Sequence, residues 1–235
     1  MTPNRVTWRS IPYACAVALH FLWSAIPSSA QVPTNHGEIK NYQGLHAAAR
    51  HGDIATILEL ASSGADLEAR DTPGRTPLHL AAFASREEAV QALAQAGAKL
   101  NALEHQAYNI VTIAAVANNL EILDLALSLG GNPGNITSPY DGTALIAAAH
   151  LGHHEIVLRL IDGGAPLDHV NNLGWTALME AIVLGNGGPN HIETVRLLVS
   201  AGADKSIAGP EGMSPLMHAL ERKYSAITAL LKSAD

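Results

Sequence analysis

Apolar residues along the chain fall into short segments with helical spacing. Segments such as 54–61 and 156–161 place Ile, Leu and Ala at i, i+3 and i+4, which predicts amphipathic helices. Each of these segments is preceded by an alanine-rich one, such as LHAAARH at 45–51 or ALIAAAH at 144–150. Their small side chains would let neighbouring helices approach closely. The pattern predicts an all-α fold built from pairs of short helices.

The alanine-rich segments recur along the chain with a period close to 33 residues. One apolar residue marks the same position in each segment, with gaps of 33, 33, 34, 33 and 38 residues: Leu45, Leu78, Val111, Leu145, Leu178 and Leu216. A second marker follows nineteen residues later at Gly64, Gly97, Gly130 and Gly164, and 24 residues later at Gly202. Two independent markers with one spacing indicate internal repeats.

Helix-capping residues define the ends of the repeating unit. Thr76, Thr143, Thr176 and Ser214 can each cap the first helix of a repeat, and Pro77 and Pro215 suit its first position, which needs no N–H. The recurrent glycine after the second helix suits the left-handed conformation that ends many helices. Each repeat therefore reads as two short helices followed by an extended link.

This unit resembles the ankyrin repeat, whose T-P-L-H-x-A signature is complete from Thr76 to Ala81. The resemblance implies an all-α solenoid of six helix-turn-helix repeats with hairpin links, over residues 41–71, 72–104, 105–137, 138–170, 171–208 and 209–235. The first and last repeats depart most from the pattern, as terminal repeats do. The fifth has about five extra residues within its inter-helix turn, at 185–191.

Residues 1–30 have the order of a secretory signal peptide rather than of a repeat. Arg5 and Arg9 precede a mainly apolar stretch at 11–26, and Ser28 and Ala30 suit a cleavage site after Ala30. The apolar stretch is shorter than the ~20 residues that a spanning helix needs, which disfavours an uncleaved anchor. We expect a flexible tether at 31–40, and a periplasmic or secreted protein without a membrane association after cleavage.

Composition narrows the classes of partner and chemistry. The formal charge of −7 becomes −9 without Arg5 and Arg9, which argues against nucleic acid and anionic membranes. The single cysteine, Cys15, lies in the leader, so the rest of the chain forms no disulfide. No catalytic motif is present, and His154-Glu155 lacks the second histidine of a zinc protease helix. We expect a monomeric protein that is not an enzyme and holds no cofactor.

The ankyrin resemblance implies that a protein partner binds the hairpin tips and the exposed, concave side of the first helices. Two positions per repeat, together with Tyr140 at a hairpin tip and Glu180, give the candidate partner-binding residues: Tyr42, Arg50, Arg75, Phe83, Tyr108, Tyr140, His150, Trp175, Glu180 and Met213. Aromatic residues concentrate here, and they dominate binding energy at interfaces. We expect Trp175 to be at least partly exposed and Glu180 to be an exposed charge beside it.

An alternative is a small-ligand or metal binder that uses the groove near Trp175, Glu180 and the fifth-repeat insertion. His153, His154 and His191 are weak metal candidates, because histidines in successive inter-helix turns could share an ion. A histidine after glycine is also ordinary in this turn, where it binds backbone groups. The resemblance to exported bacterial ankyrin proteins implies a partner protein such as an exported enzyme, whose identity the sequence does not give.

Overall fold

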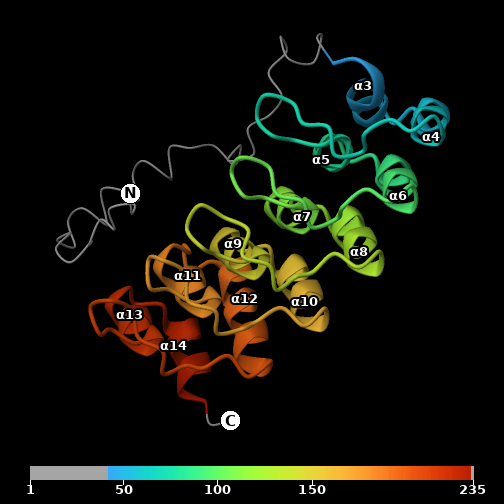
Figure 1. The fold of residues 1–235 in the computed structure, drawn as a ribbon. Helices are drawn as coiled ribbons and strands as arrows, with labels where there is room; N and C mark the ends of the chain where they lie inside the picture. Colours follow the sequence, from blue (N-terminus) through green and yellow to red (C-terminus); the bar gives the residue numbers. More distant parts are fainter. Residues whose placement is uncertain (1–41, 234–235) are drawn as a thin grey trace, which may run out of the picture. The chain divides into compact units, whose positions relative to one another are not determined.

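The computed structural model describes residues 42–233, and every regular element in that range is an α-helix (Figure 1). The predicted leader and tether lie outside the described residues. The helices are α3 (Gly44–His51), α4 (Ile54–Ser62), α5 (Pro77–Phe83), α6 (Glu87–Gln95), α7 (Ile110–Ala117), α8 (Leu120–Ser128), α9 (Ala144–Leu151), α10 (His154–Asp162), α11 (Ala177–Val183), α12 (Pro189–Ser200), α13 (Pro215–Glu221) and α14 (Ser225–Lys232). None of these helices is both long and apolar enough to cross a membrane.

The helices form two rows. The first helix of each repeat packs against the first helix of the next, from α3 to α13, and the second helices pack in the same way, from α4 to α14 (Figure 1). Each pair is followed by a loop without regular structure, which we call a hairpin loop: residues 63–76, 96–109, 129–143, 163–176 and 201–214. The predicted all-α ankyrin-type solenoid is confirmed.

The predicted capping residues stand where the first helices begin. Thr143, Thr176 and Ser214 accept backbone N–H groups of α9, α11 and α13 through their hydroxyl oxygens. Pro77 and Pro215 are the first residues of α5 and α13. The glycines that follow the second helices all have positive φ, between 82° and 104°, which other residues rarely adopt. Local sequence therefore sets both ends of the helix pair.

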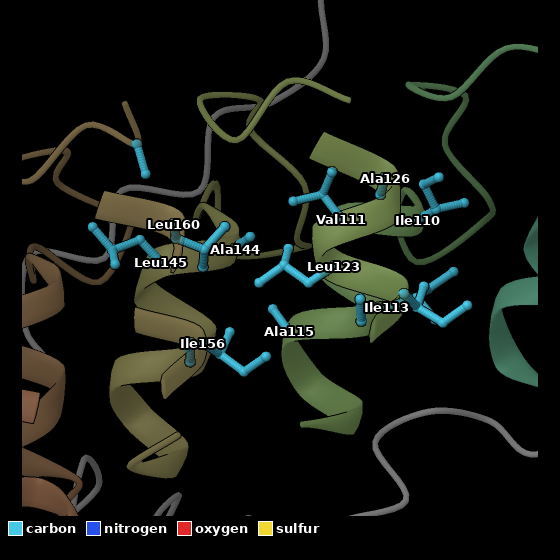
Figure 2. Close-up of a cluster of buried hydrophobic side chains, with 14 of the residues drawn as sticks. Ile110, Val111, Ile113, Ala115, Leu123, Ala126, Ala144, Leu145, Ile156 and Leu160 are labelled. Carbon is cyan, nitrogen blue, oxygen red and sulfur yellow. The ribbon is translucent and has the colours of Figure 1, made fainter. Parts of the chain in front are cut away.

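Contacts between repeats form a continuous apolar core. Figure 2 shows Val111 and Leu123 of the third repeat beside Leu145, Ile156 and Leu160 of the fourth. The side chains of all five are essentially buried, and full burial of such a side chain contributes about 1.5–3 kcal/mol. Alanines such as Ala115 and Ala144 are buried at the same seam, where their size allows close approach of the backbones. Val111 and Leu145, which mark the repeat period in the sequence, thus lie where two repeats meet.

Buried polar groups also join successive repeats. The Nδ1 atom of His79 accepts the backbone N–H of Thr76 at 3.1 Å, so the ring carries its proton on Nε2. Nε2 lies 3.0 Å from the carbonyl oxygen of Ala102 and 3.2 Å from that of Tyr108, both in the next hairpin loop. Burial is the main cause that lowers the pKa of His79 to about 4. The neutral ring therefore links the second repeat to the third.

We predict that acid destabilises the protein through His79. The unfolded ring has a pKa near 6.5, so between about pH 6.5 and pH 4 the unfolded state binds a proton that the native state does not. The free energy of unfolding then falls as pH falls, by about 2 kcal/mol or more at pH 4.5. Urea denaturation of the wild type and of His79→Gln at pH 7 and pH 4.5 measures it. The stability advantage of the wild type over the variant should shrink by that amount at pH 4.5. The same advantage at both pH values would contradict this account.

Candidate protein-binding surface

One backbone hydrogen bond recurs at the tip of every hairpin loop. The N–H of Asp71 donates to the carbonyl of Arg75, and the same bond joins Glu104 to Tyr108, Asn171 to Trp175 and Gly209 to Met213, each at 3.0 Å. In the hairpin loop at 129–143, Thr137 donates to Gly142 at 2.8 Å, with one more residue in the turn. This bond gives the loops a common register, in which corresponding positions can be compared.

A side-chain acceptor reinforces the turn in four of the five hairpin loops. The carboxylates of Asp71 and Glu104, the amide oxygen of Asn171 and the hydroxyl of Ser138 each accept the N–H of the residue that closes the turn, at 2.7 to 3.1 Å. Gly209 occupies this position in the sixth repeat and has no side chain. Four turns are therefore held by a backbone and a side-chain hydrogen bond, and the last turn only by its backbone bond.

Hydrogen bonds also connect neighbouring hairpin loops. His105 N–H donates to the carbonyl of Pro73 at 3.1 Å, and Asn172 N–H donates to the carbonyl of Tyr140 at 2.9 Å. The Arg70 guanidinium donates to the carbonyl of Leu103 at 2.6 Å. Because these bonds cross from one repeat to the next, the loops hold each other in place and present a preorganised surface.

Two of the expected partner-binding residues are buried. Only 2% of Arg75 is exposed, and its guanidinium pairs with Asp71 at 2.8 Å and donates to the Tyr42 hydroxyl at 2.8 Å. Glu180 was expected to be an exposed charge, and this is wrong because only 4% of it is exposed. The charge of Arg75 is satisfied inside the fold, which leaves it no free donor face for a partner.

Glu180 binds two neighbours instead of facing solvent. One carboxylate oxygen accepts the amide N–H of Asn171 at 2.8 Å, and the other lies 3.0 Å from Nδ1 of His150 on the preceding first helix. Asn171 itself fixes the Trp175 turn. The carboxylate therefore ties a hairpin loop to two first helices, and its role visible in the structure is positional.

The tyrosines of the expected face differ in exposure. Tyr42 is half-buried, donates its hydroxyl to Asp71 at 2.7 Å and stacks on His46. Tyr108 is half-buried against the core, and burial, with smaller effects of Glu104 and Tyr140, raises its pKa. Tyr140 is exposed at the hairpin tip of the fourth repeat, with 39% of its surface accessible. Among the three tyrosines, Tyr140 offers the most surface to a partner.

Trp175 is partly exposed, as expected, but its indole N–H is not. Nε1 is buried and has no hydrogen-bond acceptor. The ring lies against the Gly209 turn of the next repeat, where an added Cβ would stand 3.2 Å from Nε1 and 3.1 Å from Cε of Met179. The missing side chain at Gly209 thus makes room for the indole. One edge of Trp175 packs between repeats, and the remainder faces outward.

The four remaining candidates are half-buried. Arg50, Phe83, His150 and Met213 each retain part of their surface. His150 contacts Glu180 as described above, and the backbone carbonyl of Met213 accepts the bond from Gly209 that closes the sixth turn. Arg50 and Phe83 line a cavity at the other end of the first helices, away from the hairpin loops.

Sequence reasoning missed a row of exposed aliphatic residues on the hairpin loops. The residue directly before each turn bond is Leu103, Ile136 and Val170 in three successive repeats, with 37%, 52% and 45% of the surface exposed. We call these three residues the apolar hairpin row. Arg70 and Ala208 occupy the same position at its two ends. The signal in the sequence is an aliphatic residue in an otherwise polar turn, at a position that carries no aromatic residue in any repeat.

Two of the three weak metal candidates bind groups of the protein. Nδ1 of His153 lies 3.0 Å from the Ala115 carbonyl, and both ring nitrogens of His191 have partners, the Asn186 side chain and the His150 carbonyl. His154 begins α10. Within residues 42–233 no group of three or more His, Cys, Asp or Glu could hold a metal ion.

The fifth-repeat insertion is packed rather than open. Part of it extends α12, which begins at Pro189. The Tyr224 ring of the sixth repeat covers the rest: an added Cβ on Gly187 would lie 2.5 Å from that ring, and the Tyr224 hydroxyl donates to the Gly185 carbonyl at 3.1 Å. A groove for a ligand at this insertion is therefore not supported.

A family model of ankyrin repeats in three copies matches residues 19–104 and 111–209, which is more than half of the chain. A protein of Escherichia coli (strain K12), described as an ankyrin repeat protein and named YahD, is 33% identical over 189 residues, or 80% of this chain and 93% of the relative. The chain belongs to the ankyrin repeat family.

Solved ankyrin structures share the architecture. An ankyrin repeat domain from Acinetobacter baumannii AYE has a TM-score of 0.75 and 43% sequence identity, covering 80% of this chain and 95% of that one. The ankyrin repeat protein EF0377 has a TM-score of 0.74 and 29% identity, covering 83% of this chain and all of the other. Ankyrin repeats generally mediate interactions between proteins and are typically non-catalytic. In this ankyrin protein, the hairpin loops are held in place by hydrogen bonds and carry exposed aliphatic residues.

We predict that Trp175 contributes to the free energy of unfolding as well as to the exposed surface of the hairpin loops. Removing a core Trp costs about 3–5 kcal/mol, and because this ring is only half-buried we expect Trp175→Ala to lower the free energy of unfolding by about 2 kcal/mol. Tyr140→Ala is the matched control at an exposed aromatic and should cost under about 0.5 kcal/mol. Urea denaturation compares them. Equal, small losses would show that the contact with Gly209 has no energetic role.

Proposed function

We propose that this ankyrin protein is a non-catalytic module that binds another protein through its hairpin loops. The observation that carries the proposal is the apolar hairpin row of Leu103, Ile136 and Val170. Exposed aliphatic side chains recur there one repeat apart, on loops that hydrogen bonds hold in register. Contiguous exposed apolar surface marks interaction sites in proteins that otherwise keep their surfaces polar.

Neighbouring residues supply the other elements of a binding surface. Tyr140 and Leu173 are exposed at the tips of adjacent loops, with 39% and 38% accessible surface. Trp175 adds part of its ring to the same set of loops. Apolar and aromatic anchors surrounded by polar atoms are typical of the centres of protein interfaces. Because the loops are already fixed, little conformational entropy would be lost on binding.

The alternatives find less support in the described residues. A metal or small-ligand site near Trp175 needed Glu180 and the fifth-repeat insertion, and both are occupied by contacts within the protein. We propose no enzymatic role, because the buried titratable groups His79 and Glu180 are bound to neighbouring repeats. The acidic composition supports a protein partner rather than nucleic acid or an anionic membrane. We propose that the module acts as a monomer.

We predict that polar substitution of the apolar hairpin row weakens partner binding. The triple variant Leu103→Ser, Ile136→Ser and Val170→Ser should bind at least about a hundredfold more weakly, since an interface anchor is worth about 1–2 kcal/mol or more. Partners would be captured from an extract of the source organism, identified by mass spectrometry and purified, and their affinities measured by calorimetry.

The control for this test uses exposed leucines outside the hairpin loops. Leu58 on α4 and Leu158 on α10 are 53% and 41% exposed, and Leu58→Ser with Leu158→Ser should leave affinity unchanged. Circular dichroism checks that both variants are folded. A purified partner that binds the hairpin variant as tightly as the wild type would refute the hairpin loops as its site.

We also propose that the protein is exported, which makes an exported protein such as an enzyme its natural class of partner. The support is the order of charged, apolar and small residues in 1–30. Expressed with these residues in a Gram-negative host, the protein should appear in the periplasm or medium with Gln31 at its amino terminus, within a residue or two. Mass spectrometry of the intact product measures this. A membrane-bound product that retains Arg5 and Arg9 would overturn the proposal.

A further inference from the structure

A small cavity lies where the first two helix pairs meet, at the opposite end of the first helices from the hairpin loops. It has a volume of about 260 Å³ and is lined by Arg50, His51, Phe83, Ala84 and Arg86. Arg50 and His51 form the last turn of α3, Phe83 ends α5, and Arg86 directly precedes α6. Three of the five residues carry basic side chains, in a chain whose formal charge is −7.

Local structure brings the two arginines together. Gly52 ends α3 in the left-handed conformation, with φ of 75°. The aliphatic stem of Arg86 lies over this glycine, where an added Cβ would be 3.2 Å from Cδ of Arg86. The guanidinium is thereby directed toward the end of α3, with Nε 3.5 Å from the Arg50 carbonyl. The carbonyl end of a helix favours cations, which explains how two arginines can approach each other here.

The positive charge of this cavity is not balanced within residues 42–233. Arg75, Arg159 and Arg196 each pair with a carboxylate within 4.0 Å, whereas Arg50 and Arg86 have no such pair. Nε of Arg50 is also buried without any hydrogen-bond acceptor. Leaving a buried donor unsatisfied is costly, more so when the donor is charged. An anion in the cavity would lie beside two guanidinium groups whose charge no carboxylate of the described residues neutralises.

The size and chemistry of the cavity define the anion. Guanidinium groups present paired N–H donors that match the two oxygens of a carboxylate. A volume of about 260 Å³ lies below the roughly 300–1,000 Å³ of pockets for drug-sized ligands, so one acidic side chain fits better than a large metabolite. The partly exposed Phe83 ring offers an apolar wall to the methylene groups of that side chain.

We propose that this cavity is a binding pocket for an Asp or Glu side chain of a peptide segment in the partner protein. The pocket deepens the proposed protein-binding function and rests on it, because it supplies a second point of contact of defined chemistry. Both guanidinium groups bind the carboxylate, and His51 lies at the exposed rim. The partner therefore carries an acidic residue in addition to the apolar surface that meets the hairpin row.

Chemical shift titration of the full-length, isotope-labelled protein tests the pocket without the partner. The probe is acetyl-Gly-Glu-Gly-amide, and the neutral control is acetyl-Gly-Gln-Gly-amide. The chemical shifts of the backbone amides of residues 50–52 and 83–87 should change saturably as the Glu peptide is added. The protein should bind the Gln peptide at least tenfold more weakly. Equal binding of the two peptides, or shifts located mainly in the hairpin loops, would overturn the proposal.

Variants and competing anions sharpen the assignment. Arg50→Gln and Arg86→Gln should each weaken the Glu peptide at least tenfold, whereas Arg159→Gln removes the same charge from α10 and should change nothing. Wild-type affinity in both pocket variants would overturn the proposal. Tenfold tighter binding of glutarate would assign the pocket to a free dicarboxylate, and tenfold tighter binding of inorganic phosphate would assign it to a phosphate group. Either result would overturn the peptide assignment.

The hairpin variant separates failure of the pocket from failure of the proposed function. Leu103→Ser, Ile136→Ser and Val170→Ser should lose partner affinity but bind the Glu peptide like the wild type, since the pocket is at the other end of the first helices. If the triple variant keeps both its partner affinity and its peptide binding, the hairpin loops are refuted as the binding site and the pocket stands. If the triple variant loses partner affinity but even the wild type does not bind the peptide, the pocket is refuted and the hairpin site stands.

Discussion

Packing of one helix pair on the next is the interaction on which this structure depends. The helices have seven to twelve residues, a length at which isolated helices are at best marginal in water. Each buries its apolar side chains only by contact with adjacent repeats, as Val111, Leu123 and Leu145 do at the seam between the third and fourth. Stability is therefore shared along the array, and a repeat cannot be understood apart from its neighbours.

This dependence explains why the polar bonds between repeats matter. Apolar packing alone would tolerate small shifts of one pair relative to the next, but His79 must meet the carbonyls of Ala102 and Tyr108. Glu180 likewise must reach both His150 and Asn171. Directional bonds between repeats fix the register that the core only favours. The hairpin loops, which have no helix bonds of their own, inherit their positions from that register.

The fold could be predicted from the sequence because its signals are local and repeated. Capping hydroxyls such as Thr143, prolines such as Pro77 and the glycines after the second helices act within one repeat, and each occurs several times. The candidate site was predicted less well, because exposure depends on contacts between repeats. Glutamate is a residue type that is usually exposed, and only the positions of His150 and Asn171 show why Glu180 is buried.

The burial of Arg75 and of Trp175 also depends on residues in adjacent repeats. Arg75 is buried because Tyr42, 33 residues earlier, and Asp71 in its own turn complete its hydrogen bonds. Trp175 is partly buried because Gly209, 34 residues later, lacks the side chain that the other loops carry at that position. In both cases the deciding residue stands in an adjacent repeat.

The apolar hairpin row follows from the same constraint. Each turn is fixed by a backbone bond, and four of the five also by a capping side chain. Arg70 adds a bond to the next loop from the position just before the turn bond. Three successive repeats instead use the exposed aliphatic residues Leu103, Ile136 and Val170 there. Folding gains nothing from exposed aliphatic side chains, which cost solubility. Their recurrence on loops whose positions are already fixed is what supports the proposal that these residues bind a partner.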